Sequence, residues 1–297
     1  MTEQTSTSNR ADSSLRFLFE EADIRGEIVQ LDRAFTEVLA PHQYAPGVRR
    51  LLGEFLAAAV LLSTTLKFEG KLVLQARSQG QLPLLMVECS SELDIRGIAR
   101  GAEQATAVDF GQLLADGQLA ITIDPQRGQR YQGVVTLEGD SLATCLDSYF
   151  QQSEQLQTRL WLSCDGQRAA GMLTQQLPAQ LVKDPEQRSA QWEHVYALAS
   201  TVSDEELLQL YPAQLLHRLY HEDSLRLFEP RPVRCRCSCS RERCLAALMS
   251  LGAVEVEDIL QEQGSVNMDC EFCTARYEFF REDLSEILEP PKDHTLH

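Results

Sequence analysis

Residues 233–244 read VRCRCSCSRERC, so four of the nine cysteines in the chain fall within twelve residues. A second pair, CEFC, follows at residues 270–273. Thiolates bind zinc tetrahedrally, and two ligands on one tight turn with two on another form the closed, structural type of site. Cys237 and Cys239 make a C-x-C, and Cys270 and Cys273 make a C-x-x-C after 30 intervening residues. This spacing predicts a four-cysteine site that holds one zinc per chain in the reduced protein.

The remaining thiols and imidazoles leave some alternatives open. Cys235 could form the C-x-C with Cys237, and Cys244 is also close in sequence. His217 and His221, four residues apart, could form a metal pair on a helix, but a solvated helix face is the favoured interpretation. Three cysteines lie inside apolar patterns and are expected to be small core residues: Cys89, Cys145 and Cys164. No role is assigned to two histidines near the C-terminus: His294 and His297.

The composition is that of a globular protein with an acidic surface. The chain has 297 residues, of which 43% are hydrophobic and 24% charged, close to the globular average. Single cores stop growing near ~250 residues, so one large and one small domain are expected. The formal net charge of −17 repels phosphate backbones and therefore disfavours general nucleic-acid binding.

The most apolar run is LLGEFLAAAVLLSTTL, at residues 51–66, which contains Glu54. A membrane-spanning helix needs about 20 apolar residues, so a buried helix is expected instead. Residues 1–14 are polar and are expected to form a disordered tail rather than a signal peptide. Without a targeting segment the protein is expected to be cytoplasmic, where thiols stay reduced, and the cysteines then indicate metal or redox chemistry rather than permanent disulfides.

Residues 15–178 are expected to form an α+β domain, with an antiparallel sheet and packed helices. Short apolar segments between Gly, Pro or Asp breaks predict the strands of a meander: residues 71–76, 84–89, 95–100, 119–123 and 131–137. The buried helix would cover one face of this sheet. Asp140 and Ser141 are suitable caps for a helix that ends near Gln152, and WLSC at 161–164 indicates a further strand.

Prolines divide residues 179–232 into short helical segments, and Ser203 with Glu206 predicts a capping box. Helices of about ten residues are marginal in isolation, so this segment is expected to keep its structure only by docking on another part of the protein. We interpret it as a metastable helical linker. The alternative is an ordinary helical arm packed permanently on the first domain.

Residues 233–287 are expected to form a small zinc-binding redox-switch domain, followed by a tail at 288–297. Two helices are predicted, one after Arg241 in LAALMSLG and one in VEVEDILQEQ. A unit of about 55 residues rarely folds on apolar burial alone, and a metal usually supplies the deficit. Zinc contributes roughly 10–16 kcal/mol of apparent folding energy in small domains, and its thiolate ligands are the species that oxidants attack. Oxidation would therefore release the metal and unfold the unit.

Several long motifs resemble the bacterial 33 kDa heat-shock chaperones, a family also called redox-regulated holdases or 33 kDa chaperonins. The resemblance rests on CSCSRERC, on CEFC starting 31 positions beyond Cys239, and on the preceding LHRLYHEDSLRLFEPRPVR. It continues through LLGEFLAAAVLLSTTLKFEGKLVLQ, RYQGVVTLEGDSLATCLDSYFQQSEQLQTRLWL and AAGMLTQQLP, and it covers residues 17–287.

The resemblance implies an ATP-independent holdase rather than an enzyme. In this family the C-x-C is followed by Ser and Arg, which selects Cys237 and Cys239 as ligands over Cys235. Reduced, zinc-bound members are inactive. Oxidation is implied to form the disulfides Cys237–Cys239 and Cys270–Cys273, to release zinc, to unfold the C-terminal domain and linker, and to expose apolar surface for unfolding client proteins. The active form is expected to be a homodimer that binds neither nucleic acid nor membrane.

Two other function classes compete with this interpretation. A zinc-ribbon adaptor for nucleic acid or a polymerase is suggested by a basic cluster, for which an electrostatic collar around the thiolates is the favoured explanation: Arg231, Arg234, Arg236, Arg241 and Arg243. A thiol oxidoreductase would use CEFC, but such enzymes place C-x-x-C beside a βαβ unit, and the SVNMD that precedes Cys270 indicates none. The chain has no G-x-S-x-G, phosphate loop or H-E-x-x-H.

Overall fold

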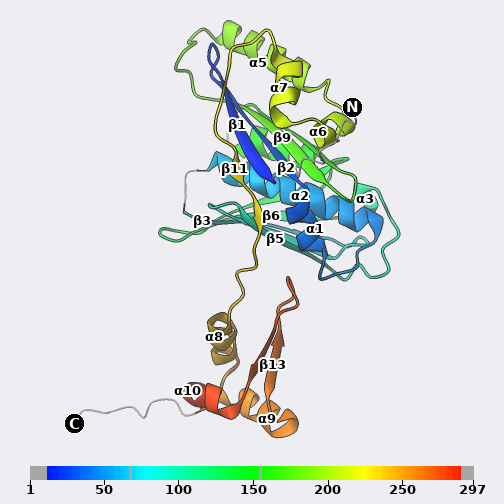
Figure 1. The fold of residues 1–297 in the computed structure, drawn as a ribbon, viewed down its shortest axis with the longest axis vertical. Coiled ribbons are helices and arrows are strands. Elements are labelled where there is room, and N and C mark those ends of the chain that lie inside the picture. Colours follow the sequence, from blue (N-terminus) through cyan, green and yellow to red (C-terminus); the bar gives the residue numbers. More distant parts are fainter. Residues whose placement is uncertain (1–11, 67–68, 154–155, 289–297) are drawn as a thin grey trace, which may run out of the picture. The chain divides into compact units, whose positions relative to one another are not determined.

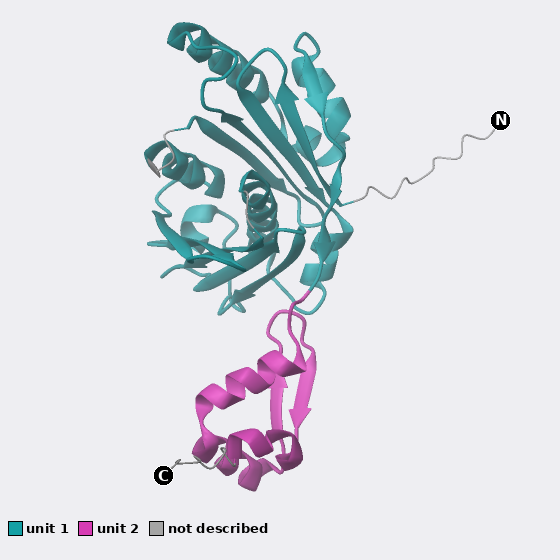
Figure 2. Cartoon of the chain, turned by 90° about the vertical axis from the view of Figure 1, so that its left-hand side faces the viewer, with its two compact units in different colours: residues 1–236 teal, residues 237–297 magenta. Residues whose placement is uncertain are grey.

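The chain divides into two units, residues 1–236 and residues 237–297, which are teal and magenta in Figure 2. The structure is a computed structural model that describes residues 12–66, 69–153 and 156–288. Unit 1 contains two larger sheets and seven helices in its described part, and unit 2 contains a two-stranded sheet with short helices. This architecture confirms the predicted α+β fold class.

Two mainly antiparallel sheets form the body of unit 1 (Figure 1). The first has the order β10–β1–β2–β9–β8, with β11 also paired to β1, and consists of β1 (Ser13–Phe19), β2 (Ile24–Leu31), β8 (Thr158–Cys164), β9 (Ala169–Gln176), β10 (Leu225–Leu227) and β11 (Arg231–Pro232). The second has the order β12–β5–β4–β3–β6–β7 and consists of β3 (Gly70–Arg77), β4 (Leu84–Ser90), β5 (Asp94–Arg100), β6 (Gln118–Pro125), β7 (Tyr131–Thr136) and β12 (Arg234–Cys235). Only β12 runs parallel to its neighbour, β5, within the described strands.

The apolar run of the sequence forms α2 (Pro46–Thr65), which lies between the two sheets (Figure 1). It contacts β2, β8 and β9 of the first sheet and β3, β4 and β5 of the second. Every residue from Phe55 to Leu62 is buried, which explains why this helix is apolar on all sides. The expected buried helix is thus confirmed. It covers both sheets rather than the one that was predicted.

The predicted strands and helix of the second half of this domain are present. The five expected strands are β3 to β7, each within two residues of the predicted bounds. WLSC lies in β8, and the predicted helix is α4 (Leu142–Ser153), where the Ser141 hydroxyl accepts a hydrogen bond from the backbone N–H of Thr144. The two remaining helices in this part of the chain are α1 (Arg33–Leu39) and α3 (Phe110–Leu113).

Strands β1, β2 and β9 were not predicted, because the first sheet is covered on both faces. In β9, seven consecutive residues are buried, so the sequence does not alternate between apolar and polar residues. In β2, Gly26 interrupts the apolar pattern, and it pairs with Phe17 of β1. A Cβ at Gly26 would lie 2.0 Å from the Phe17 ring, so glycine is required there by packing rather than by a turn.

The segment 179–232 docks on the face of the first sheet that points away from α2 (Figure 1). Its helices are α5 (Pro185–Ala199), α6 (Asp204–Gln209) and α7 (Pro212–Tyr220). Their apolar side chains share a core with Phe17, Ile28 and Met172 of the sheet. The capping box is confirmed, since Ser203 and Glu206 each bond the other's backbone N–H. The segment is therefore held by docking, as expected, and its metastability stays a prediction.

The expected domain limits differ from the structure at two places. Ser13 and Ser14 are not tail residues: they begin β1, where the buried Ser14 hydroxyl donates to Glu27 at 2.6 Å. Val233 is buried in the core of unit 1, and β12 pairs with β5, so residues 233–236 belong to unit 1 rather than to the small unit. Residues 1–11 and 289–297, with His294 and His297, lie outside the described part of the chain.

Unit 2 contains both predicted helices, α8 (Arg241–Leu251) and α9 (Ala253–Gln263). A hairpin of β13 (Val266–Asp269) and β14 (Arg276–Phe279) follows, and then a 3-10 turn at 281–284 and α10 (Ser285–Leu288). Its core contains six buried apolar residues among the described ones: Leu248, Val256, Leu260, Val266, Phe279 and Leu284. A core of this size is small for an independent unit, so a further constraint is needed to hold it.

One buried carboxylate holds the start of the docked segment. Asp23, at 6% exposure, accepts backbone hydrogen bonds from Gln180, Leu181 and Val182 and forms an ion pair with Arg188 at 2.9 Å. Burial alone would raise the pKa of Asp23, but the three N–H groups and Arg188 outweigh it and lower the pKa below its usual value.

We expect Asp23→Asn to weaken this docking by about 1–3 kcal/mol, because Arg188 loses its counter-charge in a buried place. The folded-state pKa is lowered, so the charge of Asp23 stabilises the fold above the unfolded-state pKa near 3.8 and stops doing so as the pH falls through the folded value. Hydrogen exchange of the amides at 180–182 should rise at pH 7. The matched control is Asp184→Asn at the exposed cap of α5, since Asn caps helices as well as Asp. Equal protection in both variants would contradict the role of Asp23.

A candidate metal centre in the C-terminal unit

The C-x-C segment lies immediately before α8 and is held by its neighbours. Ser240 is the N-cap of α8, and its hydroxyl accepts a hydrogen bond from the backbone N–H of Arg243. The guanidinium of Arg243 donates to the carbonyl and to the hydroxyl of Ser238, at 2.6 and 2.7 Å. Because Ser238 stands between Cys237 and Cys239, these contacts fix the backbone that carries both thiols.

The C-x-x-C pair lies on the turn between β13 and β14. Cys270 donates its N–H to the carbonyl of Ala275, and Thr274 donates to the carbonyl of Cys270, both at 2.8 Å. Thr274 has a φ of 57°, in the left-handed region, which closes the turn tightly. The hairpin register, with Asp269 opposite Arg276, leaves the two cysteines on this turn.

The turn and the segment bring all four predicted ligands together. The sulfur atoms of Cys237, Cys239, Cys270 and Cys273 lie within 4.8 Å of one another. Two of the separations between the motifs are 3.6 Å for Cys237–Cys270 and 3.4 Å for Cys239–Cys273. A tetrahedral zinc site with Zn–S bonds of about 2.3 Å has sulfurs about 3.8 Å apart, so the four thiols fit such an ion. All nine cysteines are free thiols.

Crowding of the thiols opposes their ionisation. Burial, followed by hydrogen bonds with Cys239, Cys237 and Cys270, raises the pKa of Cys273 to about 12. Burial also raises the pKa of Cys270, and its contact with Cys237 acts in the same direction. Four thiolates at these separations repel one another, and a divalent cation at the centre reverses this penalty. The donor set is therefore suited to a bound cation and unsuited to four free anions.

Tyr277 contacts the cluster directly, and Arg241 contacts strand β14 of the hairpin that carries Cys270 and Cys273. The Tyr277 hydroxyl donates to the sulfur of Cys239 at 3.2 Å, and this bond is the first cause that raises the tyrosine pKa. Arg241 lies over the ring of Phe279 at 4.3 Å and donates to the carbonyl of Glu278. Tyr277 lies on β14, and no motif or spacing in the sequence marks it as a partner of Cys239.

The other candidate ligands lie elsewhere. Cys235 is in β12 of unit 1, and Cys244 is on α8. Among the described residues the four-cysteine cluster is the only group of three or more side chains that could hold a metal ion, and neither Cys235 nor Cys244 belongs to it. His217 on α7 and His221, the C-cap residue of this helix, are both exposed, as the solvated-face interpretation expected. The three core cysteines are confirmed as buried: Cys89, Cys145 and Cys164.

Four of the five arginines of the basic cluster contact other groups of the protein. In unit 1, Arg231 donates to the carbonyl of Ser91, and Arg236 forms an ion pair with Asp94 at 3.5 Å. In unit 2, the ion pair of Arg241 with Asp283 measures 2.8 Å, and Arg243 binds the C-x-C segment as described above. These contacts favour a structural role for the arginines over a phosphate-binding surface.

The described helices include none with the length and apolar character needed to cross a bilayer. The fold and the cluster therefore define a two-unit α+β protein whose small unit carries a candidate metal–thiolate centre.

Comparison with known proteins identifies the family. The profile described as Hsp33 protein matches residues 12–280, and the chain belongs to the Hsp33 family, a family of chaperones. A 33 kDa chaperonin of Pseudomonas aeruginosa LESB58 is 54% identical over 282 residues, which cover 94% of this chain and 95% of that protein. One of Azotobacter vinelandii is 56% identical over 279 residues, covering 93% and 94%. The crystal structure of the 33 kDa chaperonin of Thermotoga maritima has the same fold, with a TM-score of 0.78 at 22% identity over 93% of this chain and 98% of that one.

The ligand set can be tested within unit 2 itself. We expect Cys270→Ser to lower the affinity for zinc by at least about 100-fold, more than the loss of a supporting contact costs, and to increase the protease sensitivity of residues 237–288. Cys244→Ser is the matched control, because it removes a thiol of the same unit outside the cluster. Chelator competition and limited proteolysis of the reduced proteins measure both effects. Equal metal affinity in the two variants would show that the ligands are misassigned.

Proposed function

We propose that this protein is a redox-regulated, ATP-independent holdase and not an enzyme. The observation that carries the proposal is the cluster of four sulfurs within 4.8 Å in a unit that has only a small apolar core among its described residues. The chaperonin names of the relatives support the chaperone class. In this proposal the reduced form binds one zinc ion through Cys237, Cys239, Cys270 and Cys273 and does not bind clients.

When bound, zinc stabilises the thiolates and supplies roughly 10–16 kcal/mol of apparent folding energy to a unit of this kind. The protein residues complete the site. Arg243 and Ser240 hold the C-x-C segment, and the turn closed by Thr274 holds the C-x-x-C pair. The fold of unit 2 then depends on whether the four sulfurs remain available as ligands.

The switch step is an oxidation of the thiolates by a peroxide or hypochlorite. Cys237 and Cys239 lose two electrons and form one S–S bond, and Cys270 and Cys273 form a second in the same way. Each hydrogen peroxide accepts two electrons and two protons, its O–O bond breaks, and two waters form. Each hypochlorous acid accepts two electrons and one proton, its O–Cl bond breaks, and chloride and water form. Because the disulfide sulfurs are no longer thiolates, the cation is lost and with it the constraint on unit 2.

The proposed client surface is the apolar face that docking covers. Residues of α5, α6 and α7 such as Trp192, Leu207 and Leu216 are buried against the first sheet. Residues 231–236, which lead into unit 2, are held to the sheets by β11 and β12, of two residues each, by the buried side chain of Val233 and by the contacts of Arg231 and Arg236. Undocking of the metastable segment 179–232 would expose both its own apolar side chains and the sheet face to unfolding proteins. We further propose that the active form is a homodimer in the cytoplasm, without nucleic-acid or membrane partners.

The switch predicts that oxidation and activity rise together. Treatment of the reduced, zinc-loaded protein with peroxide at elevated temperature should release one zinc per chain, measured with a chromophoric chelator. In parallel, light scattering of a thermally unfolding client should fall, and peptide mapping should find Cys237–Cys239 and Cys270–Cys273. Equal suppression of aggregation by the reduced and oxidised proteins would defeat the proposed switch.

A further prediction concerns the Tyr277 hydroxyl. An O–H···S bond withdraws electron density from a thiolate and makes it less nucleophilic. We expect Tyr277→Phe to oxidise and release zinc several-fold faster. Tyr196→Phe, which removes the hydroxyl of an exposed tyrosine in unit 1, is the control. A rate of zinc release that is unchanged in Tyr277→Phe would exclude this role.

A further inference from the structure

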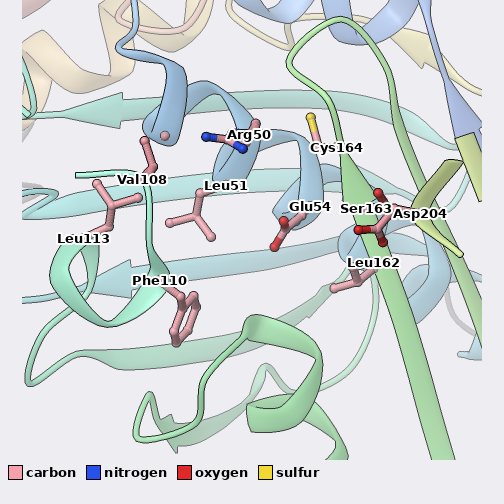
Figure 3. Close-up of a pocket in the computed structure, with 11 residues that line it drawn as sticks. Arg50, Leu51, Glu54, Val108, Phe110, Leu113, Leu162, Ser163, Cys164 and Asp204 are labelled. Carbon is pink, nitrogen blue, oxygen red and sulfur yellow. The ribbon is translucent and has the colours of Figure 1, made fainter. Parts of the chain in front are cut away.

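A cavity of about 190 Å³ lies in unit 1 between α2, the segment that leads into α3, β8 and the first residue of α6 (Figure 3). One part of its wall is apolar and is lined by Leu51, Val108, Phe110, Leu113 and Leu162. The other part is polar and is lined by Arg50, Glu54, Ser163 and Asp204. A concave surface on which a few polar groups converge is a feature of small-ligand sites, and here the polar part supplies most of the accessible wall.

Three of these polar groups have no partner within the described part of the chain. Glu54, Asp204 and the Ser163 hydroxyl make no hydrogen bond or ion pair there, although Ser163 is only 5% exposed. Arg50 comes from the same helix as Glu54, and Figure 3 shows its guanidinium directed away from the Glu54 carboxylate. Ser163 is a buried residue, and polar groups of buried residues are satisfied in the large majority of cases, so its hydroxyl is suited to an external partner. Glu54 is partly buried and Asp204 is exposed at the mouth of the cavity.

The charge balance selects a cation. The cavity contains two carboxylates and one guanidinium, and no charged side chain from the segment that leads into α3 lines it. Cys164 of β8 is the remaining titratable group, and burial raises its pKa to about 12, so it is a neutral thiol. Glu54 and Asp204 do not belong to any group of three or more metal-ligand side chains in the described residues, which disfavours a divalent metal.

We propose that this cavity binds a primary alkylammonium ion, with the ammonium group between Glu54 and Asp204 and the alkyl stem on the apolar wall. The ammonium donates three hydrogen bonds and is matched to two carboxylates and the Ser163 hydroxyl. Such an ion would connect α2 and β8 to α6, and so to the docked segment 179–232. The same chemistry is offered by a free alkylamine and by a lysine side chain of a polypeptide.

The protonation of Glu54 gives the site a defined pH dependence. Burial, with a smaller contribution from the Asp204 carboxylate, raises the pKa of Glu54 to about 7, and Arg50 opposes this. Because the folded-state pKa of an acid is raised, ionised Glu54 destabilises the fold increasingly as the pH rises from 4.5 through 7. A bound cation relieves this penalty, so it should bind more tightly above pH 7 than below it.

The experiment is a titration of the full-length reduced protein with n-butylammonium, in which isothermal titration calorimetry measures the affinity at pH 6 and at pH 8. A pKa near 7 makes Glu54 about ten times more ionised at pH 8, so the affinity is expected to rise up to about tenfold. Hydrogen exchange of α6 should slow when the ligand is bound. N-acetyl-lysine amide in place of butylammonium tests the polypeptide source, and binding of either ligand supports the site.

Two variants keep the proposal falsifiable. Glu54→Gln should weaken binding at pH 8 and remove the pH dependence, and Asp204→Asn should weaken binding at both pH values. Glu103→Gln, an exposed acid of unit 1, should change neither. Equal binding of neutral n-butanol, unchanged affinity in Glu54→Gln, or no saturable binding at pH 8 would each overturn the proposal. These outcomes do not depend on whether the protein is a redox-regulated holdase.

Discussion

Four sulfur atoms within 4.8 Å of one another are the constraint on which unit 2 depends. Thiols at these distances do not ionise together, and burial and mutual contact keep the pKa of Cys273 near 12. A divalent cation bound between the four sulfurs would make their ionisation favourable, because each thiolate is attracted to the cation more strongly than it is repelled by its neighbours. The six buried apolar residues described in this unit are too few to replace that attraction. Under the proposed function, the folding of unit 2 would therefore depend on whether the four sulfurs are available as ligands, which is the property that a thiol-based switch requires.

Unit 1 is stabilised in a different way. Its central helix, α2, is buried between two sheets, and the first sheet is covered again by α5, α6 and α7 on its other face. This core does not depend on a cysteine pair, since Cys89, Cys145 and Cys164 are inert thiols inside apolar packing. An oxidant that changes unit 2 can therefore leave the main body of unit 1 intact. Under the proposed function, such a division would let unit 1 keep its fold while unit 2 responds to the oxidant.

The sequence predicts those parts of the structure that depend on local pattern. Strands β3 and β4 alternate between buried and partly exposed residues over most of their lengths. The spacing of Cys237, Cys239, Cys270 and Cys273 identifies the cluster. Strand β9 is not predicted, because burial on both faces removes the alternation of apolar and polar residues. Glycine is required at position 26 of β2 because the ring of Phe17 occupies the space of a side chain, and no local sequence pattern predicts this contact. Tyr277, Asp23 and the Glu54 cavity also depend on contacts between distant segments, which a single sequence does not encode in periodicity or spacing.

Two carboxylates from outside the docked segment 179–232, those of Asp23 and Glu54, act on its docking in opposite directions. Asp23 is satisfied by three backbone N–H groups and Arg188, and it holds the start of the segment. Glu54, in contrast, lies near Asp204 of α6 without a hydrogen-bond partner in the described residues, and this proximity opposes docking when both are ionised. The two contacts therefore act on docking in opposite directions. Under the proposed function, a change in unit 2 or in the cavity would shift the docking equilibrium only by its differential effect on the docked and undocked states.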